Sequence, residues 1–138
     1  MAKKIRSYVD TSAFIAFLDR SDQFHPLFAR LFSNPPELIT SPLVIAEGHA
    51  WFLKRYDNYR AIQFLNLIEE LTVLSIISLD GAELKRSTQL LRKFADQELT
   101  LADALGLVLM KRHKVKVCWS TDRHLRLTGV PLVVHHNA

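Results

Sequence analysis

The chain has 138 residues, of which 49% are hydrophobic and 23% are charged, with four glycines, five prolines and one cysteine. This composition excludes a disordered, low-complexity or disulfide-stabilised protein and predicts one folded domain over residues 1–138. The formal net charge of +4 permits a polyanionic partner without requiring one.

The first half of the chain alternates short apolar strand-like runs with pairs of helical segments. Apolar residues at helical spacing mark the helices, and an Asn-Pro-Pro break at residues 34–36 separates two of these segments from the next strand. Ser41 and Pro42 fit the N-cap and first position of a helix. The expected strands are residues 5–9 and 38–40, and the expected helices are residues 11–20, 22–32, 42–55 and 58–71.

The second half continues this alternation. A run rich in β-branched residues predicts a further strand, and Asp80 and Glu83 mark the start of the helix that follows it. The expected strands are residues 73–79, 115–119 and, at the edge, 132–134, and the expected helices are residues 80–94 and 100–113. Alternating strands and helices, with no repeat or linker, predict an α/β sandwich around a small parallel sheet.

Four acidic residues occupy unusual positions in this pattern. Asp10 and Asp122 follow strand-like runs, and parallel strands bring their carboxyl ends to one edge of a sheet. Glu47 has apolar neighbours one helical turn away, so we expect it to face the same side as the core-packing residues. Asp103 begins a helix that is apolar on every side, which predicts a central helix whose N-terminus opens towards the strand ends.

Each acid also has a purely structural explanation. Asp10 fits the N-cap of the helix that begins after it, and Asp122 fits a cap or turn. Residues 100–103 match a capping box that ends on Asp103, and Glu47 could reach solvent or an arginine from the edge of its apolar stripe. For any one of these acids, taken alone, the structural role remains an open alternative.

Taken together, the four acids predict a metal site. Ionised carboxylates on an apolar scaffold are costly unless a cation or hydrogen bonds compensate for the lost water. Oxygen ligands without paired cysteines or histidines select a hard cation, Mg²⁺ or Mn²⁺. Such ions activate water and stabilise leaving oxygens in phosphate chemistry, with one ion or with two. The sequence does not choose between one ion and two.

The remaining polar and aromatic features have both a functional and a structural interpretation. Six lysines and arginines lie between Lys111 and Arg126, where they could meet a polyanion or form a solvated helix end. His124 could touch a phosphate but is expected to be a surface histidine. Three aromatic residues that could stack on bases are expected to lie in the core instead: Trp51, Phe52 and Trp119.

Location follows from what the chain lacks. Cys118 has no partner for an internal disulfide, lies in an apolar run and is expected to be a buried thiol in a reducing compartment. The sequence contains no apolar segment of signal-peptide or membrane-spanning length. We therefore expect a cytoplasmic protein without membrane contact.

Four segments, in order, resemble the motifs of the PIN-domain ribonucleases, and most closely those of the VapC-like toxins of type II toxin–antitoxin systems. The similarity covers essentially the whole chain and departs from the family pattern at Pro42, where relatives often carry a polar or acidic residue. The four segments are Tyr8-Val9-Asp10-Thr11-Ser12-Ala13, Thr40-Ser41-Pro42-Leu43-Val44-Ile45-Ala46-Glu47, Leu99-Thr100-Leu101-Ala102-Asp103-Ala104 and Ser120-Thr121-Asp122-Arg123-His124.

This resemblance implies a three-layer α/β/α fold and Mg²⁺- or Mn²⁺-dependent endoribonuclease activity. The implied partners are an RNA substrate, whose phosphates the basic stretch would contact, a cognate antitoxin protein and a second copy in a homodimer. The alternative is a non-catalytic RNA- or protein-binding module that keeps the fold. The implied metal-binding and catalytic residues are Asp10, Glu47, Asp103 and Asp122, and Glu47 would either join the metal shell or orient the attacking water. Asp96 matches a further acid found in part of the family. Ser12 and Thr121 would supply supporting hydroxyls.

Overall fold

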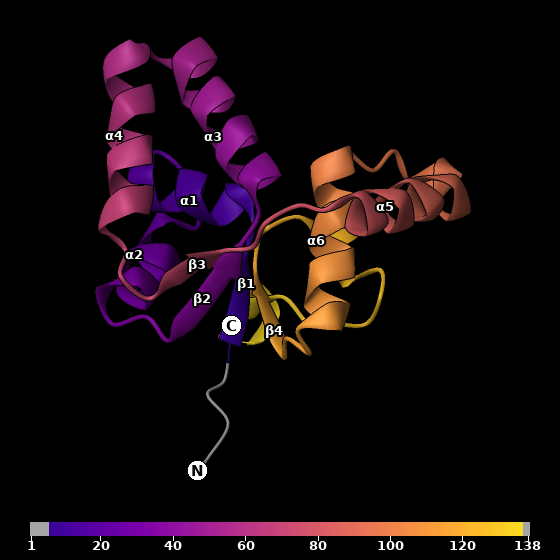
Figure 1. Cartoon of the computed structure of the whole chain (residues 1–138). Coiled ribbons are helices and arrows are strands. Elements are labelled where there is room, and N and C mark those ends of the chain that lie inside the picture. Colours follow the sequence, from indigo (N-terminus) through magenta and orange to yellow (C-terminus); the bar gives the residue numbers. More distant parts are fainter. Residues whose placement is uncertain (1–5, 137–138) are drawn as a thin grey trace.

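The computed structural model describes residues 6–136 of the chain, so the expected first strand residue, Ile5, lies outside the described part. Four strands form one parallel sheet in the order β3-β2-β1-β4 (Figure 1). They are β1 (Arg6–Val9), β2 (Glu37–Thr40), β3 (Leu74–Ile76) and β4 (Val117–Trp119). β1 is therefore central, with β2 and β4 as its neighbours.

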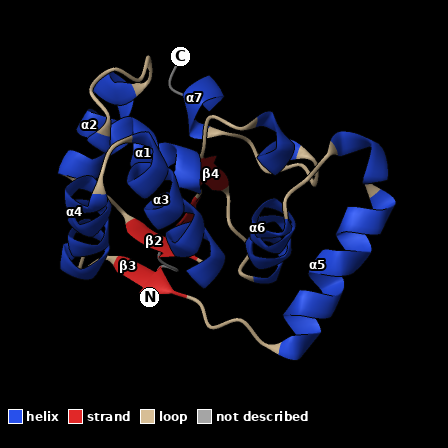
Figure 2. Cartoon of the chain, turned by 90° about the horizontal axis from the view of Figure 1, so that it is seen from above, coloured by secondary structure: helices blue, strands red, loops and turns tan. Residues whose placement is uncertain are grey.

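Helices cover both faces of this sheet, which confirms the three-layer α/β/α sandwich (Figure 2). On one side lie α1 (Thr11–Leu18), α2 (His25–Ser33), α3 (Pro42–Arg55) and α4 (Asn58–Glu70), and on the other lie α5 (Gly81–Lys93) and α6 (Leu101–Arg112). Two 3₁₀ turns, η1 (Ala95–Gln97) and η2 (Arg123–Arg126), and a short α7 (Val133–His136) complete the described chain. Over residues 6–136, no helix combines the length and apolar character that crossing a bilayer requires.

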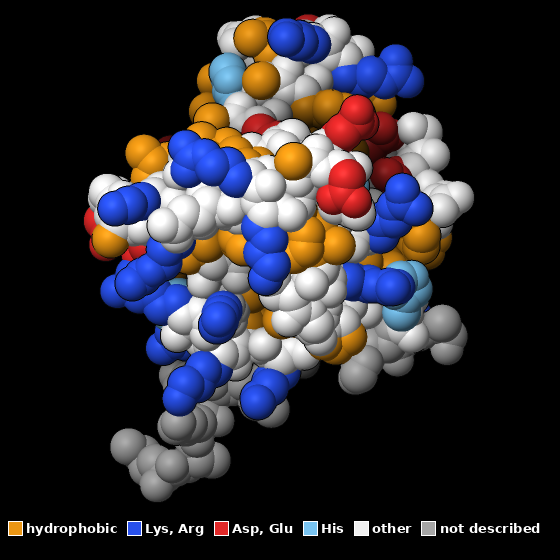
Figure 3. All heavy atoms as spheres, turned by 90° about the vertical axis from the view of Figure 1, so that its right-hand side faces the viewer, with side chains coloured by type: hydrophobic (Ala, Val, Ile, Leu, Met, Phe, Trp, Pro, Cys, Tyr) orange, Lys and Arg blue, Asp and Glu red, His pale blue; other side chains and the backbone are white. Residues whose placement is uncertain are grey.

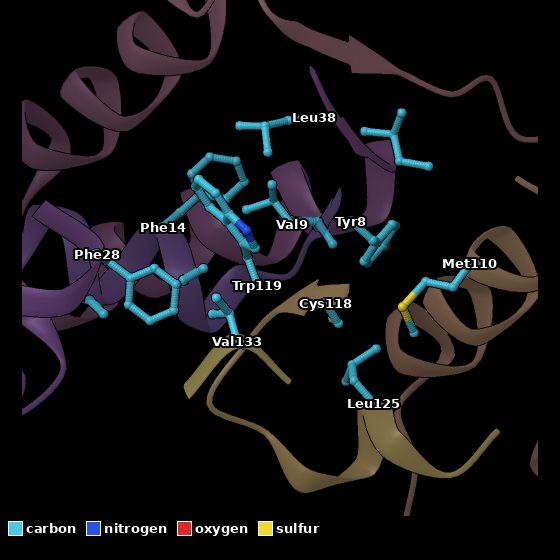
Figure 4. Close-up of a cluster of buried hydrophobic side chains, with 14 of the residues drawn as sticks. Tyr8, Val9, Phe14, Phe28, Leu38, Met110, Cys118, Trp119, Leu125 and Val133 are labelled. Atoms are coloured by element: carbon cyan, nitrogen blue, oxygen red, sulfur yellow. The ribbon is translucent and has the colours of Figure 1, made fainter. Parts of the chain in front are cut away.

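Adjacent positions of the paired strands β1 and β4 serve opposite layers of the core, because side chains alternate along a strand. Tyr8 points towards Met110 of α6, whereas Trp119 lies among the aromatic side chains of α2 (Figure 4). The Trp119 ring centroid is 6.4 Å from that of Phe28 and 4.9 Å from that of Phe32. Trp119 is only 2% exposed, which confirms its expected place in the core.

Two strands are shorter than expected, one because its neighbouring strand ends and the other because the residues before it close a helix. β3 ends at Ile76, where its neighbour β2 also ends, and the next amide donates to the Thr40 carbonyl at 2.9 Å. β4 begins only at Val117, because the Val115 amide donates to the Met110 carbonyl at 2.9 Å and so closes the end of α6. In both cases an apolar run continues beyond the strand itself.

The expected edge strand at residues 132–134 was wrong. A single bridge joins Leu132 to Cys118, and the chain then turns into α7. The Cys118 amide donates to the Pro131 carbonyl at 2.9 Å. Because the proline that precedes Leu132 has no amide hydrogen to donate, a longer ladder cannot build up from this point.

Close packing of α3 against α4 depends on Gly48. The buried residues of α3 are Val44, Gly48 and Phe52, one every four residues, which places them on one face of the helix. A Cβ atom at position 48 would overlap the ring of Phe64, which itself stacks on Phe52 with centroids 5.6 Å apart. The missing side chain at position 48 therefore lets the aromatic core reach the helix backbone.

We expect Gly48→Ala to lower the free energy of unfolding by about 1–3 kcal/mol, because the added methyl group must displace the Phe64 ring. The matched control is Gly81→Ala in the first turn of α5, where a Cβ meets no atom within 4 Å. Alanine there should leave stability unchanged or raise it by up to about 1 kcal/mol. Chemical denaturation measures both values, and equal effects of the two changes would contradict the packing argument.

Candidate functional site

The site is built around Asp10, which follows the central strand directly. Its amide donates to the Trp119 carbonyl at 3.0 Å, which extends the pairing of β1 with β4 by one step. Its carboxylate caps the N-terminus of α1, and the Oδ2 atom accepts the hydroxyls of Ser12 and Ser120, both at 2.9 Å. The residue is only 5% exposed. The fold thus holds a carboxylate in the interior at the carboxyl edge of the sheet.

Neutral groups alone solvate this carboxylate within the described part of the chain. Burial raises the pKa of Asp10, the two serine hydroxyls oppose that rise, and the charges of Asp103 and Asp122 add to it. No lysine or arginine among residues 6–136 forms an ion pair with any of these three acids or with Glu47. Within residues 6–136, the side chain that can oppose their mutual repulsion is therefore the His124 ring beside Asp122, which carries a charge only when it is protonated.

The loop after β4 is tied to Asp10 by the same serines. The Ser120 hydroxyl accepts the Asp122 amide, and the Ser12 hydroxyl accepts the Thr121 amide, each at 2.9 Å. The Oδ1 atom of Asp122 accepts the His124 amide at 3.0 Å, and Nδ1 of the His124 ring lies 3.0 Å from the same oxygen. Asp122 is therefore held in place both by this hydroxyl network and by the first turn of η2.

Asp103 serves as a helix cap and also belongs to the acidic cluster. Its Oδ2 atom accepts the Thr100 amide and its own amide donates to the Thr100 hydroxyl, both at 3.1 Å, so the expected capping box is present. One ligand atom each from Asp103, Asp122 and His124 lie within 4.8 Å of one another. Burial raises the pKa of Asp103, the bonds with Thr100 oppose the rise, and Asp122 adds to it.

Glu47 lies at the edge of the site, and the expectation that it faces the core side of α3 was wrong. The residue is exposed, because the buried face of the helix runs through Gly48 instead. The pKa of its carboxyl group nevertheless depends on the other acids of the site. Partial loss of water around it, followed by the charges of Asp103, Asp10 and Asp122, raises the pKa of Glu47 to about 7. Glu47 is therefore the acid of the four that solvent reaches most freely.

The sequence reasoning assigned no role to Ser120 and expected His124 on the surface, and one of its candidates, Asp96, lies apart. Ser120 supplies the hydroxyl that bridges Asp10 and the Asp122 amide, whereas Thr121 contributes its backbone amide. His124 is half-buried beside Asp122 rather than free on the surface. Asp96 is exposed in η1 and, like Asp10 and Glu47, it has no ligand atom in the group formed by Asp103, Asp122 and His124. The position of Ser120 directly after a strand, as for Asp10, was the available signal.

These acids could form a divalent-metal site, because the donor set fits a hard cation. The hydrogen bonds from described groups reach Oδ2 in both Asp10 and Asp103, which leaves the Oδ1 atom of each for another ligand. Carboxylate oxygens are the preferred ligands of Mg²⁺ and similar ions. A bound cation would also offset the burial and repulsion that raise the pKa values of Asp10 and Asp103.

Comparisons with known proteins agree with this geometry. The family model described as "PIN domain" matches residues 7–130. Ribonuclease VapC26 of Mycobacterium tuberculosis is 26% identical over 124 residues, which cover 83% of this chain and 85% of the relative.

Solved structures share the fold at lower identity. VapC20 of M. tuberculosis, described as a sarcin–ricin loop cleaving toxin, matches with a TM-score of 0.81 at 21% identity, over 89% of this chain and 95% of that one. A toxin–antitoxin complex from Klebsiella pneumoniae matches with a TM-score of 0.60 at 20% identity, over 91% and 94%. The four-stranded parallel sheet and its covering helices are therefore an established architecture.

We expect Asp10→Asn to raise the melting temperature of the metal-free protein by a few degrees at pH 7–8. Folding raises the pKa of Asp10, so the folded state loses stability as the pH climbs through that raised value, and asparagine mimics the protonated form. This difference in melting temperature should vanish at about pH 4 and below, where Asp10 becomes protonated in the unfolded chain too.

Thermal unfolding in the presence of a chelator measures this effect. Asp57→Asn is the control, because Asp57 is also an N-cap but lies exposed at the start of α4. A lower melting temperature for Asp10→Asn across the whole pH range would show that the carboxylate stabilises the fold rather than straining it.

Proposed function

The chain belongs to the PIN domain family, and we propose that it is a metal-dependent endoribonuclease that hydrolyses RNA phosphodiester bonds, as the toxin of a toxin–antitoxin pair. The observation that carries the proposal is the approach of Asp103, Asp122 and His124 to within 4.8 Å of one another, beside the buried Asp10. The similarity of the chain to the ribonuclease VapC26 and to VapC20, a toxin that cleaves the sarcin–ricin loop, supports the proposal.

The ion in this proposal is Mg²⁺ or Mn²⁺, held by Asp10, Asp103 and Asp122. Glu47 either joins the metal shell or orients the attacking water. When bound, the ion supplies Lewis-acid stabilisation of phosphate oxygens and eases deprotonation of water. Ser12 and Ser120 fix the Asp10 carboxylate by hydrogen bonds at 2.9 Å. Asp96 is left out of this set of ligands because it is exposed and its charge is not among those that raise the pKa values of Asp10, Glu47 and Asp103.

The other side chains supply proton transfer and orientation. A carboxyl group with its pKa near 7 is suited to accept a proton from water at neutral pH, and Glu47 is the acid that solvent can reach. His124 holds Asp122 in place through its amide and its ring, both 3.0 Å from Oδ1. Thr121 supports Ser12 through its amide. The scissile phosphate would thus meet a preorganised set of oxygen ligands.

The proposed partners follow from the same function. RNA is the substrate, and a cognate antitoxin would restrain the activity, which is supported by the similar fold found in the toxin–antitoxin complex of K. pneumoniae. We also propose a homodimer and a cytoplasmic location. The free thiol of Cys118 supports the location, since it is buried on β4 and suits a reducing compartment.

A non-catalytic module with the same fold is the second candidate. The observation that favours it is the double use of the acids as caps, since Asp10 caps α1 and Asp103 completes a capping box. Caps of this kind need no metal. Metal binding and cleavage therefore separate the two candidates.

We expect Asp122→Asn to lower the rate of metal-dependent RNA cleavage by about 100-fold or more, because it removes the charge but keeps an oxygen that can accept the His124 amide. A labelled RNA and gel analysis of initial rates provide the measurement. Asp57→Asn, the exposed cap of α4, should cleave at the wild-type rate. Cleavage by Asp122→Asn at near wild-type rate would remove the basis of the proposal.

We also expect Mn²⁺ to raise the melting temperature of the wild-type protein, because a ligand that binds only the folded state stabilises it. The free energy of unfolding should rise by about 2.7 kcal/mol when the concentration of free ion exceeds its dissociation constant 100-fold. Asp122→Asn should lose most of this shift, whereas Asp57→Asn should keep it. A melting temperature that does not change on addition of Mn²⁺ would favour the non-catalytic module.

A further inference from the structure

A basic groove runs between α5 and α6, outside the acidic cluster. Its first part is a cavity of about 570 Å³. One stripe of α5 lines it, from Arg86 through Leu90 to Lys93, and faces Lys111 and neighbouring residues of α6. The residues that line this cavity include four lysines and arginines and no acid.

A second cavity of about 430 Å³ continues the first. The two share Lys93, Lys111 and Thr128, so they form one groove, which we call the α5–α6 groove. Lys114 and Lys116 also line the second part, again without an acid. The groove thus carries positive charge along its whole length.

A third cavity borders both this groove and the acidic cluster, through one shared residue on each side. It measures about 550 Å³, shares Leu127 with the second cavity, and is lined by Arg123, His124 and Arg126 of η2. His124 is also a member of the acidic cluster, so a continuous series of lining residues connects that cluster with the outer side of α5. Figure 3 shows this side of the molecule, where lysine and arginine side chains spread widely beside a small group of acidic ones.

Most of the positive charge in the groove is available to a ligand. Arg112 is already engaged, because it forms an ion pair with the buried Glu83 and lies 4.0 Å from Asp80. Arg86, Lys93 and Lys111 form no ion pair with any acid in the described part of the chain. The Lys93 amine lies 5.4 Å from the centroid of the Phe94 ring, which places it at the junction of the two cavities.

We propose that the α5–α6 groove binds the sugar–phosphate backbone of the RNA beyond the scissile bond, so that the substrate is a strand long enough to pass from the acids along η2 to α5. This inference rests on the proposed nuclease function. A series of cations in one groove matches the repeated charge of a nucleic-acid strand. Its continuity with the cluster that would hold the scissile phosphate favours RNA over an acidic peptide. Apolar groups such as Leu90 can lie under ribose and base faces.

The test compares two pairs of lysine substitutions. Lys93→Gln with Lys111→Gln removes two charges from the groove, and Lys54→Gln with Lys85→Gln removes two charges from exposed positions of α3 and α5 that do not line it. All four lysines are exposed, so both pairs should keep the wild-type melting temperature, which is checked first.

Binding is measured by fluorescence anisotropy on the Asp122→Asn background, which prevents cleavage, with an RNA of about 20 nucleotides. We expect the groove pair to weaken binding by about tenfold and to reduce the slope of log affinity against log salt by about 1.4, or 0.7 for each lost phosphate contact. The control pair should change neither value. Affinity and slope equal to those of the control pair would overturn the proposal and leave the groove to an acidic protein partner.

Cleavage kinetics on the wild-type background separate this inference from the proposed function. The groove pair should raise KM for the long RNA about tenfold with kcat unchanged, and should cleave an RNA of about four nucleotides as the wild type does. Absence of any cleavage by the wild-type protein would refute the proposed nuclease function. Intact cleavage with an unchanged KM in the groove pair would refute only the groove.

Discussion

The buried carboxylate of Asp10, at the end of the central strand, is the constraint on which the rest of the site depends. Removing a carboxylate from water is costly, and within residues 6–136 two serine hydroxyls, rather than a lysine or arginine, compensate for that loss. Those hydroxyls also hold the loop that carries Asp122. The same bonds that make Asp10 tolerable therefore set the position of the next acid.

The acid cluster shows how structural and chemical roles combine in one side chain. Asp103 gives Oδ2 to the capping box and has Oδ1 left for another ligand, so the two explanations of this residue are compatible. The cap also fixes the carboxylate, since the helix start allows it little freedom. A residue that must be rigid for binding is thus made rigid by the helix it begins. Capping and metal binding need not compete for such a carboxylate.

Much of this arrangement could be predicted from local patterns, and the remainder depends on contacts between distant segments. Strand ends, helix starts and the capping box of Asp103 are short-range features, and the positions of Asp10 and Asp122 follow from them. The role of Ser120 depends on the register of β4 against β1, where Val9 pairs with Trp119, and no local pattern records that register. The exposure of Glu47 likewise depends on α3 turning Gly48 towards Phe64. Strand lengths failed for a related reason, because apolar runs such as residues 115–119 also serve to close helices.

The pairing of the first strand with the last has a consequence for how each new copy is made. Ser120 lies 110 residues after Asp10, so the Asp10 carboxylate lacks this hydroxyl until those residues have been synthesised. At roughly 5–20 residues per second, that delay is about 5–20 seconds on the ribosome. During this time β2 can pair with β1, but the edge of β1 that β4 will occupy stays open. An emerging chain therefore carries Asp10 without the loop that completes the acid cluster until β4 has been made and has paired with β1.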